Sequence, residues 1–335
     1  MSTYIIAELS GNHNGSLETA LELVSLAKSA GADAVKLQTY TADTITLDCD
    51  NEYFRIGGGT LWDGTTLYRL YQEAATPWEW HEPIFQRAAE LGIDCLSTPF
   101  DESAVDFLER FRPPAYKIAS FELVHHPLLK KVAQTGRPVI MSTGMASIEE
   151  IEEALVVLRA AGSQDITLLK CTSSYPAPAE ETNLARIPEM AARFGTRVGL
   201  SDHTMGIAVP VAAVALGATV IEKHFCRSRS EPGPESTFSL EPEELRQMVE
   251  AVRVAEAALG RATYERTPAE EKSLPFRRSI FTTREISAGE KFTNENVRVI
   301  RPAHGLPPKH WERILASTAT RAMPKGTPLA PTDMG

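Results

Sequence analysis

The sequence lacks the features that would place the protein in a membrane, outside the cell or on nucleic acid. No apolar run approaches the ~20 residues needed to cross a bilayer. The first residues, MSTYIIAEL, carry no basic segment, so we also expect no signal peptide. The four cysteines form no CxxC pair, which is typical of reduced thiols in the cytoplasm. The formal net charge of −10 argues against nucleic acid as a partner, although a few lysines in one cleft could still attract a small anion.

What the sequence contains is one strand pattern, repeated between Tyr4 and Phe225. Apolar runs, nearly all of which turn polar at the C-terminal end, cover residues 4–9, 34–40, 93–100, 115–120, 138–144, 166–173, 197–203 and 220–225. The stretch between each pair of runs is long enough for a helix. Continuous apolar strands that alternate with helices predict an α/β fold, here a closed parallel (β/α)8 TIM barrel. Because active sites of such barrels lie at the C-terminal strand ends, the layout predicts an enzyme.

The chain exceeds the ~250 residues of an ordinary barrel, and the barrel pattern ends near Gly260. We expect the barrel over residues 1–260, a linker rich in Arg, Thr, Glu and Pro over 261–275, and a small β-rich domain over 276–335. A domain of that size buries little core and tends to lean on another surface.

Two further segments have their own patterns. Residues 284–297 match residues 321–334 position for position, which predicts an internal duplication in the small domain. An excess of chain over 41–66, between the second and third strands, is long for a barrel loop. We expect it to form a lid or substrate loop at the catalytic end.

Two histidines, His203 and His224, lie at the ends of successive strands. Because side chains alternate along a strand, Ser201 shares a face with His203, and Glu222 shares a face with His224. If those faces point into the barrel, two imidazoles and a carboxylate meet at its mouth. Such a donor set suits an open site for Mn²⁺, Co²⁺ or Mg²⁺ better than a structural zinc site. The alternative is that each histidine is a hydrogen-bonded core residue.

Two lysines, Lys36 and Lys117, interrupt apolar strands, where an unpaired ammonium group is costly to bury. Hydroxyl donors for an anion are available at four strand ends: Ser120, Ser142, Ser173 and Ser201. Charged and neutral donors together suit a phosphate. The alternative is a salt bridge within the barrel, for example between Lys36 and Glu8. Glu8 could serve as that partner, as an acid or base, or as an acceptor for a sugar hydroxyl.

Over essentially its whole length the chain resembles the sialic acid synthase family. The motifs that carry the resemblance are AELSGNHNGSLETA (7–20), AGADAVKLQTY (30–40), YKIASFE (116–122), STGMAS (142–147), KCTSSYPAP (170–178), GLSDHT (199–204) and GATVIEKHF (217–225). The segment RRSIFTTREISAGE (277–290) resembles that family's C-terminal antifreeze-like (SAF) domain, which has a β-clip fold. Within the family, AELSGNHN (7–14), GGTLWDGTTLYRLY (58–71) and TPWEWH (76–81) are most similar to pseudaminic acid synthases.

The resemblance implies a metal-dependent transferase that condenses phosphoenolpyruvate with an acetamido deoxy sugar. For the pseudaminate branch the sugar is 2,4-diacetamido-2,4,6-trideoxy-L-altrose, and the products are pseudaminate and phosphate. An N-acetylneuraminate or legionaminate synthase of the same chemistry is the nearest alternative. A more remote one is a non-catalytic barrel that binds saccharide in polysaccharide assembly.

The resemblance also assigns roles to residues at matching positions. The phosphoenolpyruvate site would comprise Lys36, Thr98, Lys117, Ser120, Ser142, Ser173 and Ser201. The catalytic residues would be Glu8, His203 and His224, with both histidines as metal ligands. The sugar would be bound by Gln38, Glu122, Tyr175, Glu235 and Arg301. Since the family delivers the matching arginine from the partner subunit, the resemblance implies a homodimer with exchanged C-terminal domains.

Overall fold

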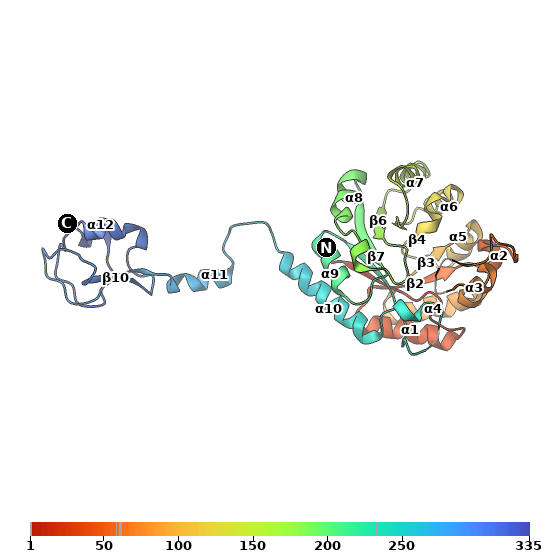
Figure 1. The fold of residues 1–335 in the computed structure, drawn as a ribbon, viewed down its shortest axis with the longest axis horizontal. Helices are drawn as coiled ribbons and strands as arrows, with labels where there is room; N and C mark the ends of the chain where they lie inside the picture. Colours follow the sequence, from red (N-terminus) through yellow and green to blue (C-terminus); the bar gives the residue numbers. More distant parts are fainter. Residues whose placement is uncertain (1, 58, 60–61, 232) are drawn as a thin grey trace. The chain divides into compact units, whose positions relative to one another are not determined.

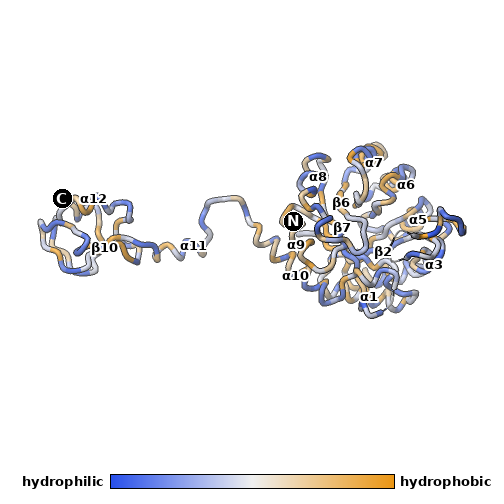
Figure 2. The backbone as a smooth tube through the Cα atoms, viewed as in Figure 1, coloured by the Kyte–Doolittle hydropathy of each residue, from blue (hydrophilic) through white to orange (hydrophobic). Residues whose placement is uncertain are grey.

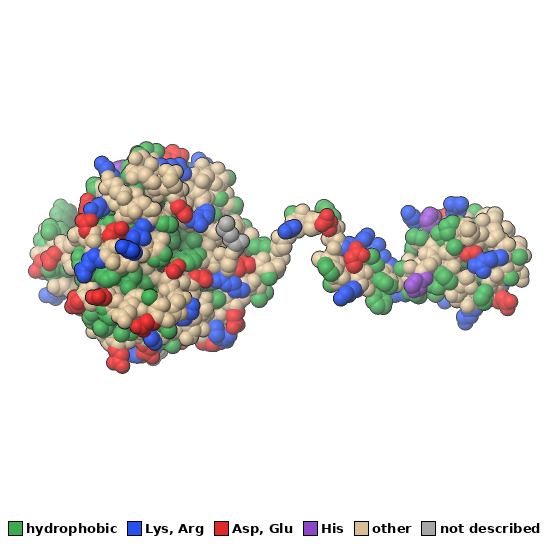
Figure 3. All heavy atoms as spheres, turned by 180° about the vertical axis from the view of Figure 1, so that it is seen from behind, with side chains coloured by type: hydrophobic (Ala, Val, Ile, Leu, Met, Phe, Trp, Pro, Cys, Tyr) green, Lys and Arg blue, Asp and Glu red, His purple; other side chains and the backbone are tan. Residues whose placement is uncertain are grey.

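A computed structural model of the chain describes residues 2–57, 59, 62–231 and 233–335. Three residues of the 58–71 motif, at 58, 60 and 61, therefore lie outside the described residues. The chain divides into two compact units, Met1–Gly260 and Arg261–Gly335 (Figure 1). On the face of each unit that Figure 3 shows, acidic and basic side chains are interspersed. No helix within the described ranges is long and apolar enough to cross a bilayer.

The first unit is a closed barrel in which each strand pairs in parallel with the next and the last pairs with the first. The strands are β1 (Tyr4–Glu8), β2 (Ala34–Thr39), β3 (Asp94–Pro99), β4 (Tyr116–Ile118), β5 (Val139–Ser142), β6 (Ile166–Cys171), β7 (Arg197–Asp202) and β8 (Val220–His224). The register between β8 and β1 runs from Val220 opposite Tyr4 to His224 opposite Glu8. The predicted TIM barrel is confirmed.

Helices surround the barrel, and hydropathy alternates along them (Figure 2). They are α1 (Leu17–Ser29), α4 (His81–Leu91), α5 (Glu102–Leu108), α6 (His126–Ala133), α7 (Ile148–Ala160), α8 (Arg186–Phe194), α9 (Ala208–Ala215) and α10 (Pro242–Leu259). Short 3-10 turns occupy Trp78–Trp80 (η1), Ser120–Val124 (η2), Ala179–Glu181 (η3) and Ser236–Phe238 (η4). Ser147 and Glu150 form the capping box that starts α7. The connection from β2 to β3 carries two additional helices, α2 (Ala42–Ile45) and α3 (Leu67–Ala74).

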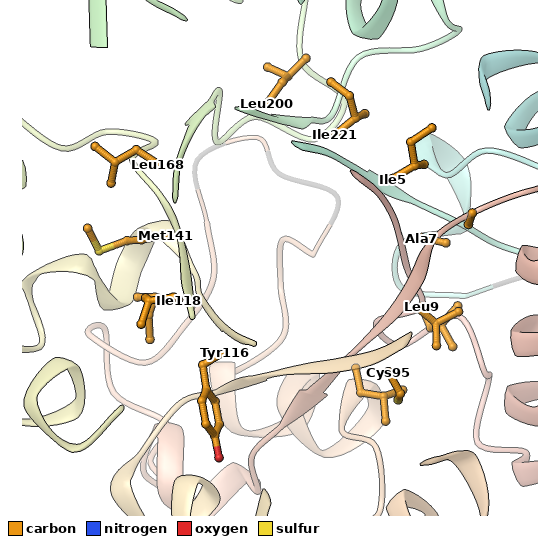
Figure 4. Close-up of a cluster of buried hydrophobic side chains, with 14 of the residues drawn as sticks. Ile5, Ala7, Leu9, Cys95, Tyr116, Ile118, Met141, Leu168, Leu200 and Ile221 are labelled. Carbon is orange, nitrogen blue, oxygen red and sulfur yellow. The ribbon is translucent and has the colours of Figure 1, made fainter. Parts of the chain in front are cut away.

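The strand alternation separates an outer apolar layer from an inner face with two zones. Outward side chains such as Tyr116, Ile118 and Met141 pack in the main core between strands and helices (Figure 4). A smaller cluster contains Ile6, Ala34, Leu96, Ala115, Ile140, Leu169 and Val220. Two residues further along the same strand faces come Glu8, Lys36 and Glu222, so this face changes from apolar to charged toward the C-terminal ends.

The second unit has its own core, formed by Ile280, Ile286, Phe292, Val297, Leu306, Ile314, Ala319, Met323 and Leu329. Its elements are α11 (Pro268–Ser273), η5 (Leu274–Phe276), β9 (Ser279–Thr282), β10 (Val297–Ile300), η6 (Pro308–His310), α12 (Trp311–Leu315) and η7 (Pro331–Asp333). The strands β9 and β10 pair antiparallel. Helix α11 falls within the segment that we expected to be a linker.

The sequence duplication corresponds to a structural repeat in this unit. The backbone N–H of Thr293 donates to Asn296 Oδ1 over 2.8 Å, and that of Ala330 donates to Asp333 Oδ2 over 2.9 Å. Gly289 and its counterpart Gly326 both adopt positive φ, at 82° and 83°, which favours glycine at each turn.

Candidate active site

Four charged side chains from four strands meet inside the barrel. Lys36 Nζ lies 2.5 Å from Glu8 Oε2 and 3.1 Å from Glu222 Oε2. Lys117 Nζ lies 3.7 Å from Glu222 Oε1. All four residues are buried. The salt bridge that we left open as an alternative for Lys36 and Glu8 is therefore present, and Glu222 joins it.

The charges in this cluster depend on one another. Burial lowers the pKa of Lys36 to about 8, against the opposing effect of Glu222. Burial would raise the pKa of Glu222, but Lys117 and Lys36 together hold it below its usual range. Glu222 is therefore ionised and compensates both lysines. Sequence reasoning placed Glu222 on the right face but expected it to join the two histidines as the carboxylate of a metal site. In the structure Glu222 pairs with Lys36 and Lys117 instead, because alternation along β8 shows the direction of a side chain and not its partners.

Serine hydroxyl groups lie beside Lys117, Glu222 and Gly144. Lys117 Nζ donates to Ser142 Oγ over 2.7 Å, and Ser201 Oγ donates to Glu222 Oε1 over 2.9 Å. A Cβ atom added to Gly144 would lie 2.5 Å from Ser173 Oγ and 2.6 Å from Ser120 Oγ. Because glycine has no Cβ, the hydroxyls of Ser120 and Ser173 can approach its backbone this closely.

Thr98, on β3, completes the set expected for phosphoenolpyruvate. Its Oγ1 is buried and has no hydrogen-bond partner within the described chain. A buried hydroxyl without a partner is costly, and a bound ligand would satisfy it.

The two histidines lie side by side at the mouth, with ring centroids 5.2 Å apart. His203 Nδ1 lies 2.8 Å from the carbonyl oxygen of Thr172, and His224 Nδ1 lies 3.2 Å from Glu235 Oε2. An Nδ1–H donated to the Thr172 carbonyl leaves Nε2 of His203 with a free lone pair, an orientation typical of metal-ligating histidines. His224 has a carboxylate close to its Nδ1, but the contact lacks hydrogen-bond geometry.

The protonation of the two imidazoles differs. Burial lowers the pKa of His224, which favours the neutral ring that a metal requires. Burial also lowers the pKa of His203, but the Cys171 thiol, whose Sγ lies 4.0 Å from Nδ1, outweighs this effect and raises the pKa above its usual value. A metal that binds His203 would therefore have to displace a proton from the ring. Within the described ranges no three His, Cys, Asp or Glu side chains are grouped closely enough to hold a metal by themselves. The donor set fits an open site with two protein ligands, completed by water or substrate.

The sugar-binding residues predicted in the barrel line one cavity of about 450 Å³. These are Gln38, Glu122, Tyr175 and Glu235. Gln38 Nε2 donates to Ser10 Oγ over 2.9 Å, and the ring of Tyr175 packs 4.3 Å from that of His203. Burial raises the pKa of Glu122 to about 7, and its Oε2 has no hydrogen-bond partner in the described structure.

Arg301 belongs to the second unit, where it is exposed directly after β10. Within the barrel, three further polar residues of the motifs lie outside this arrangement. Lys170 donates to the Cys171 carbonyl and to Thr172 Oγ1, beside a separate cavity of about 580 Å³ that contains no predicted site residue. Lys223 pairs with Asp202 over 2.5 Å. His13 accepts a hydrogen bond from the Gly15 N–H within its loop, and burial lowers its pKa to about 4.

Comparison with known proteins agrees with this geometry. The model of the NeuB family matches residues 23–264, and that of the SAF domain matches residues 277–334. The chain belongs to the NeuB family. The resemblance seen in its motifs is thereby confirmed, and the matched region includes the strands that carry both histidines and both lysines.

Two relatives from one organism differ in their similarity to this member of the NeuB family. The pseudaminic acid synthase of Campylobacter jejuni is 46% identical over 326 residues, which cover 97% of this chain and 95% of that protein. The N,N'-diacetyllegionaminic acid synthase of Campylobacter jejuni is 38% identical over 323 residues, which cover 95% of this chain and 96% of that protein. Among solved structures, the spore coat polysaccharide biosynthesis protein spsE of Bacillus subtilis has a TM-score of 0.66 at 37% identity, covering 100% of this chain and 95% of that one.

Proposed function

We propose that the protein is a pseudaminic acid synthase. It condenses phosphoenolpyruvate with 2,4-diacetamido-2,4,6-trideoxy-L-altrose and water, and it releases pseudaminate and phosphate. The observation that carries the proposal is the convergence of Lys117 and the serine hydroxyls near Gly144 with the paired histidines and the adjoining cavity. The higher identity to a pseudaminic than to a legionaminic acid synthase supports the choice of sugar.

The phosphate group of phosphoenolpyruvate is expected beside Gly144. There Lys117 supplies charge, while Ser120, Ser142 and Ser173 supply hydroxyl donors. Lys36 and Thr98 complete the site. Donors that are already in place stabilise the departing phosphate without reorganisation during the reaction.

We propose that the Nε2 atoms of His203 and His224 hold a divalent ion, Mn²⁺, Co²⁺ or Mg²⁺. Bound there, such an ion supplies Lewis-acid polarisation of the sugar aldehyde. The carbonyl of Thr172 orients the ring of His203 for this task, and the carboxylate of Glu235 lies close to the ring of His224.

The reaction then uses the remaining side chains. The enol carbon of phosphoenolpyruvate attacks the aldehyde carbon, and the aldehyde oxygen takes up a proton from solvent to become a hydroxyl group. The resulting cation at C2 is captured by water, whose proton passes to Glu8. The C2–O bond to phosphate then breaks while the hydroxyl group at C2 passes its proton to the departing phosphate, which leaves a ketone and inorganic phosphate. Lys36 and Lys117 compensate the charge that develops on the phosphate.

For assembly, we propose a homodimer with exchanged C-terminal units, in which Arg301 contacts the sugar in the partner's barrel. Exposed apolar side chains support a docked cover at the barrel mouth. Phe121 is 63% exposed after β4, Met145 is 56% exposed after β5, and Met205 is 48% exposed after β7. A cover matters because the cationic intermediate must be protected from uncontrolled capture by bulk water.

We also propose that the protein works in the cytoplasm. Four free cysteines, three of them buried, suit a reducing compartment.

Phosphate release from phosphoenolpyruvate, measured with a panel of acetamido sugars, tests the activity. We expect release with the diacetamido trideoxy altrose to exceed release with N-acetylmannosamine by at least ~100-fold. Equal or greater release with N-acetylmannosamine, or with the legionaminate precursor, would reassign the substrate.

A further inference from the structure

Helix α3 (Leu67–Ala74) is amphipathic but is not packed into the core. Its apolar residues Leu67, Leu70, Tyr71 and Ala74 follow the i, i+3, i+4, i+7 spacing of a single helix face. An apolar face normally becomes buried against other elements. No residue of α3 is buried, and all four of these side chains line the cavity that holds the predicted sugar-binding residues.

A second apolar wall comes from the segment before α3. Ile56 is held in a short hairpin, in which its N–H donates to the Thr65 carbonyl over 2.9 Å and its carbonyl accepts from the Gly64 N–H over 3.1 Å. The same segment bonds to the start of α3, because the Leu67 N–H donates to the Phe54 carbonyl over 2.9 Å. The hairpin and helix thus present Ile56 and the α3 stripe to one cavity.

This apolar wall is continuous with the reacting centre. Trp62 Nε1 donates to the Pro234 carbonyl over 3.1 Å, directly before Glu235, and the Trp62 ring lies 6.1 Å from the ring of Tyr175. The polar lining of the cavity comprises Gln38, Glu122 and Glu235, whereas most other lining residues are apolar or aromatic. The occupant that fits has a few polar groups on one side and methyl groups on the other.

We propose that Leu70, Tyr71 and Ile56 bind the methyl groups of the sugar and select for deoxygenated, acetamido-rich substrates. This inference rests on the proposed function. The expected sugar carries three methyl groups, at C6 and on its two acetamido substituents. A sugar with a hydroxyl group at C6 would place that group against Leu70, Ile56 and the ring carbons of Tyr71. The two aliphatic side chains cannot accept or donate a hydrogen bond, so the hydroxyl group would lose the bonds it makes to water.

The test compares two sugars that differ only at C6. The full-length enzyme is assayed at saturating phosphoenolpyruvate with 2,4-diacetamido-2,4,6-trideoxy-L-altrose and with its C6-hydroxylated counterpart, and kcat/KM is measured for each. We expect the native enzyme to prefer the deoxy sugar by at least ~10-fold, the lower end of what one small apolar group contributes in a pocket. Leu70→Asn, which is similar in size but polar, should reduce that preference by at least ~10-fold. Most of the change should come from a lower kcat/KM for the deoxy sugar.

Two further variants isolate the apolar wall. Ile56→Thr makes the hairpin side of the cavity more polar and should also reduce the preference for the deoxy sugar. This variant keeps the inference testable if Leu70→Asn does not fold. Glu73→Gln, on the exposed side of α3, should leave the preference unchanged. Thermal unfolding of each variant establishes that it is folded.

The outcomes separate this inference from the proposed function. If the native enzyme releases phosphate with neither sugar, the proposed function fails. If it uses the deoxy sugar but folded Leu70→Asn and Ile56→Thr keep the native preference, the assignment of the apolar wall is overturned while the proposed function stands.

Discussion

At the scale of single residues, the two interpretations of the buried lysines are now distinguishable. Lys36 contacts Glu8 and Glu222, so the salt-bridge interpretation has its partners. Lys117, however, lies farther from Glu222 than from Ser142 Oγ, at 3.7 Å against 2.7 Å. A structural salt bridge gives no reason for the Ser142 hydroxyl to lie closer to this ammonium group than the carboxylate does. The two interpretations predict different effects on catalysis.

Replacement of Lys117 tests them. Lys117→Met should raise the KM for phosphoenolpyruvate by at least ~100-fold, because it removes a charge-assisted contact to phosphate, while the KM for the sugar changes little. Steady-state kinetics with each substrate varied in turn measures this split. The matched control is Lys223→Met, which removes a buried lysine paired with Asp202 outside the predicted site. If both variants show the same KM for phosphoenolpyruvate, Lys117 has only a structural role.

The histidine pair makes a second prediction at this scale. His224→Ala should remove bound metal and abolish turnover while the barrel stays folded, because one imidazole cannot hold a divalent ion against water. Metal content by elemental analysis and phosphate release measure the two effects. His81→Gln serves as the control, since His81 is also buried but bonds to Thr39 away from the site. Full activity of the native enzyme in excess chelator would contradict the metal role of the pair.

At the scale of elements, strand alternation explains why the barrel could be predicted. Each strand begins apolar and ends with polar side chains on its inner face, so the pattern predicted both the fold and the end of the barrel at which the candidate site lies. The boundaries were less certain where a strand passes into a turn. Residues 115–120 were expected to be extended, but β4 ends at Ile118 and Ser120 begins the turn η2.

The same pattern did not predict partners between distant elements. The proximity of Glu235 to His224 depends on the loop after β8 packing onto residues of the β1 loop; a Cβ at Gly233, for instance, would lie 2.4 Å from Asn14 Oδ1. Helix α3 was also not predicted. The apolar stripe of α3 is present in the sequence. The helix is short, however, and follows a long connection, so the sequence did not indicate that this stripe lines a cavity instead of packing in the core.

The loop after β5 carries a prediction of its own. Gly144→Ala places a methyl group within 2.5–2.7 Å of Ser173 and Ser120, closer than real Cβ atoms approach other heavy atoms. One of the hydroxyls must move, so we expect the KM for phosphoenolpyruvate to rise by ~10-fold or more with smaller changes in stability. Gly57→Ala is the control, because no heavy atom lies within 4 Å of a Cβ there. An unchanged KM in Gly144→Ala would remove Ser120 and Ser173 from the phosphate site.

At the scale of the whole molecule, the sequence predicted two parts because the hydrophobic pattern changes near Gly260. The small unit buries a core of its own, and its charged residue Arg301 is exposed. No pattern of residues in one chain can specify which subunit's barrel an exposed arginine serves.

Subunit mixing tests the exchanged dimer. Arg301→Ala and His203→Ala chains should each be inactive alone, because one lacks the sugar contact and the other lacks a metal ligand. After subunit exchange, a heterodimer contains one barrel with both histidines that receives the intact Arg301. We expect activity to recover to roughly a quarter of the native value, since half of the dimers are mixed and half of their sites are complete. Exchange without recovery would mean that Arg301 acts on its own barrel or not at all.

The central claim is that the barrel joins phosphoenolpyruvate to a sugar and releases phosphate by C–O cleavage. The most direct measurement uses phosphoenolpyruvate with oxygen-18 in the bridge between carbon and phosphorus, together with 2,4-diacetamido-2,4,6-trideoxy-L-altrose. Mass spectrometry should find unlabelled pseudaminate and phosphate that carries the label, because water supplies the new oxygen at C2. Label in the nine-carbon product, or labelled phosphate formed without any condensation product, would contradict the account.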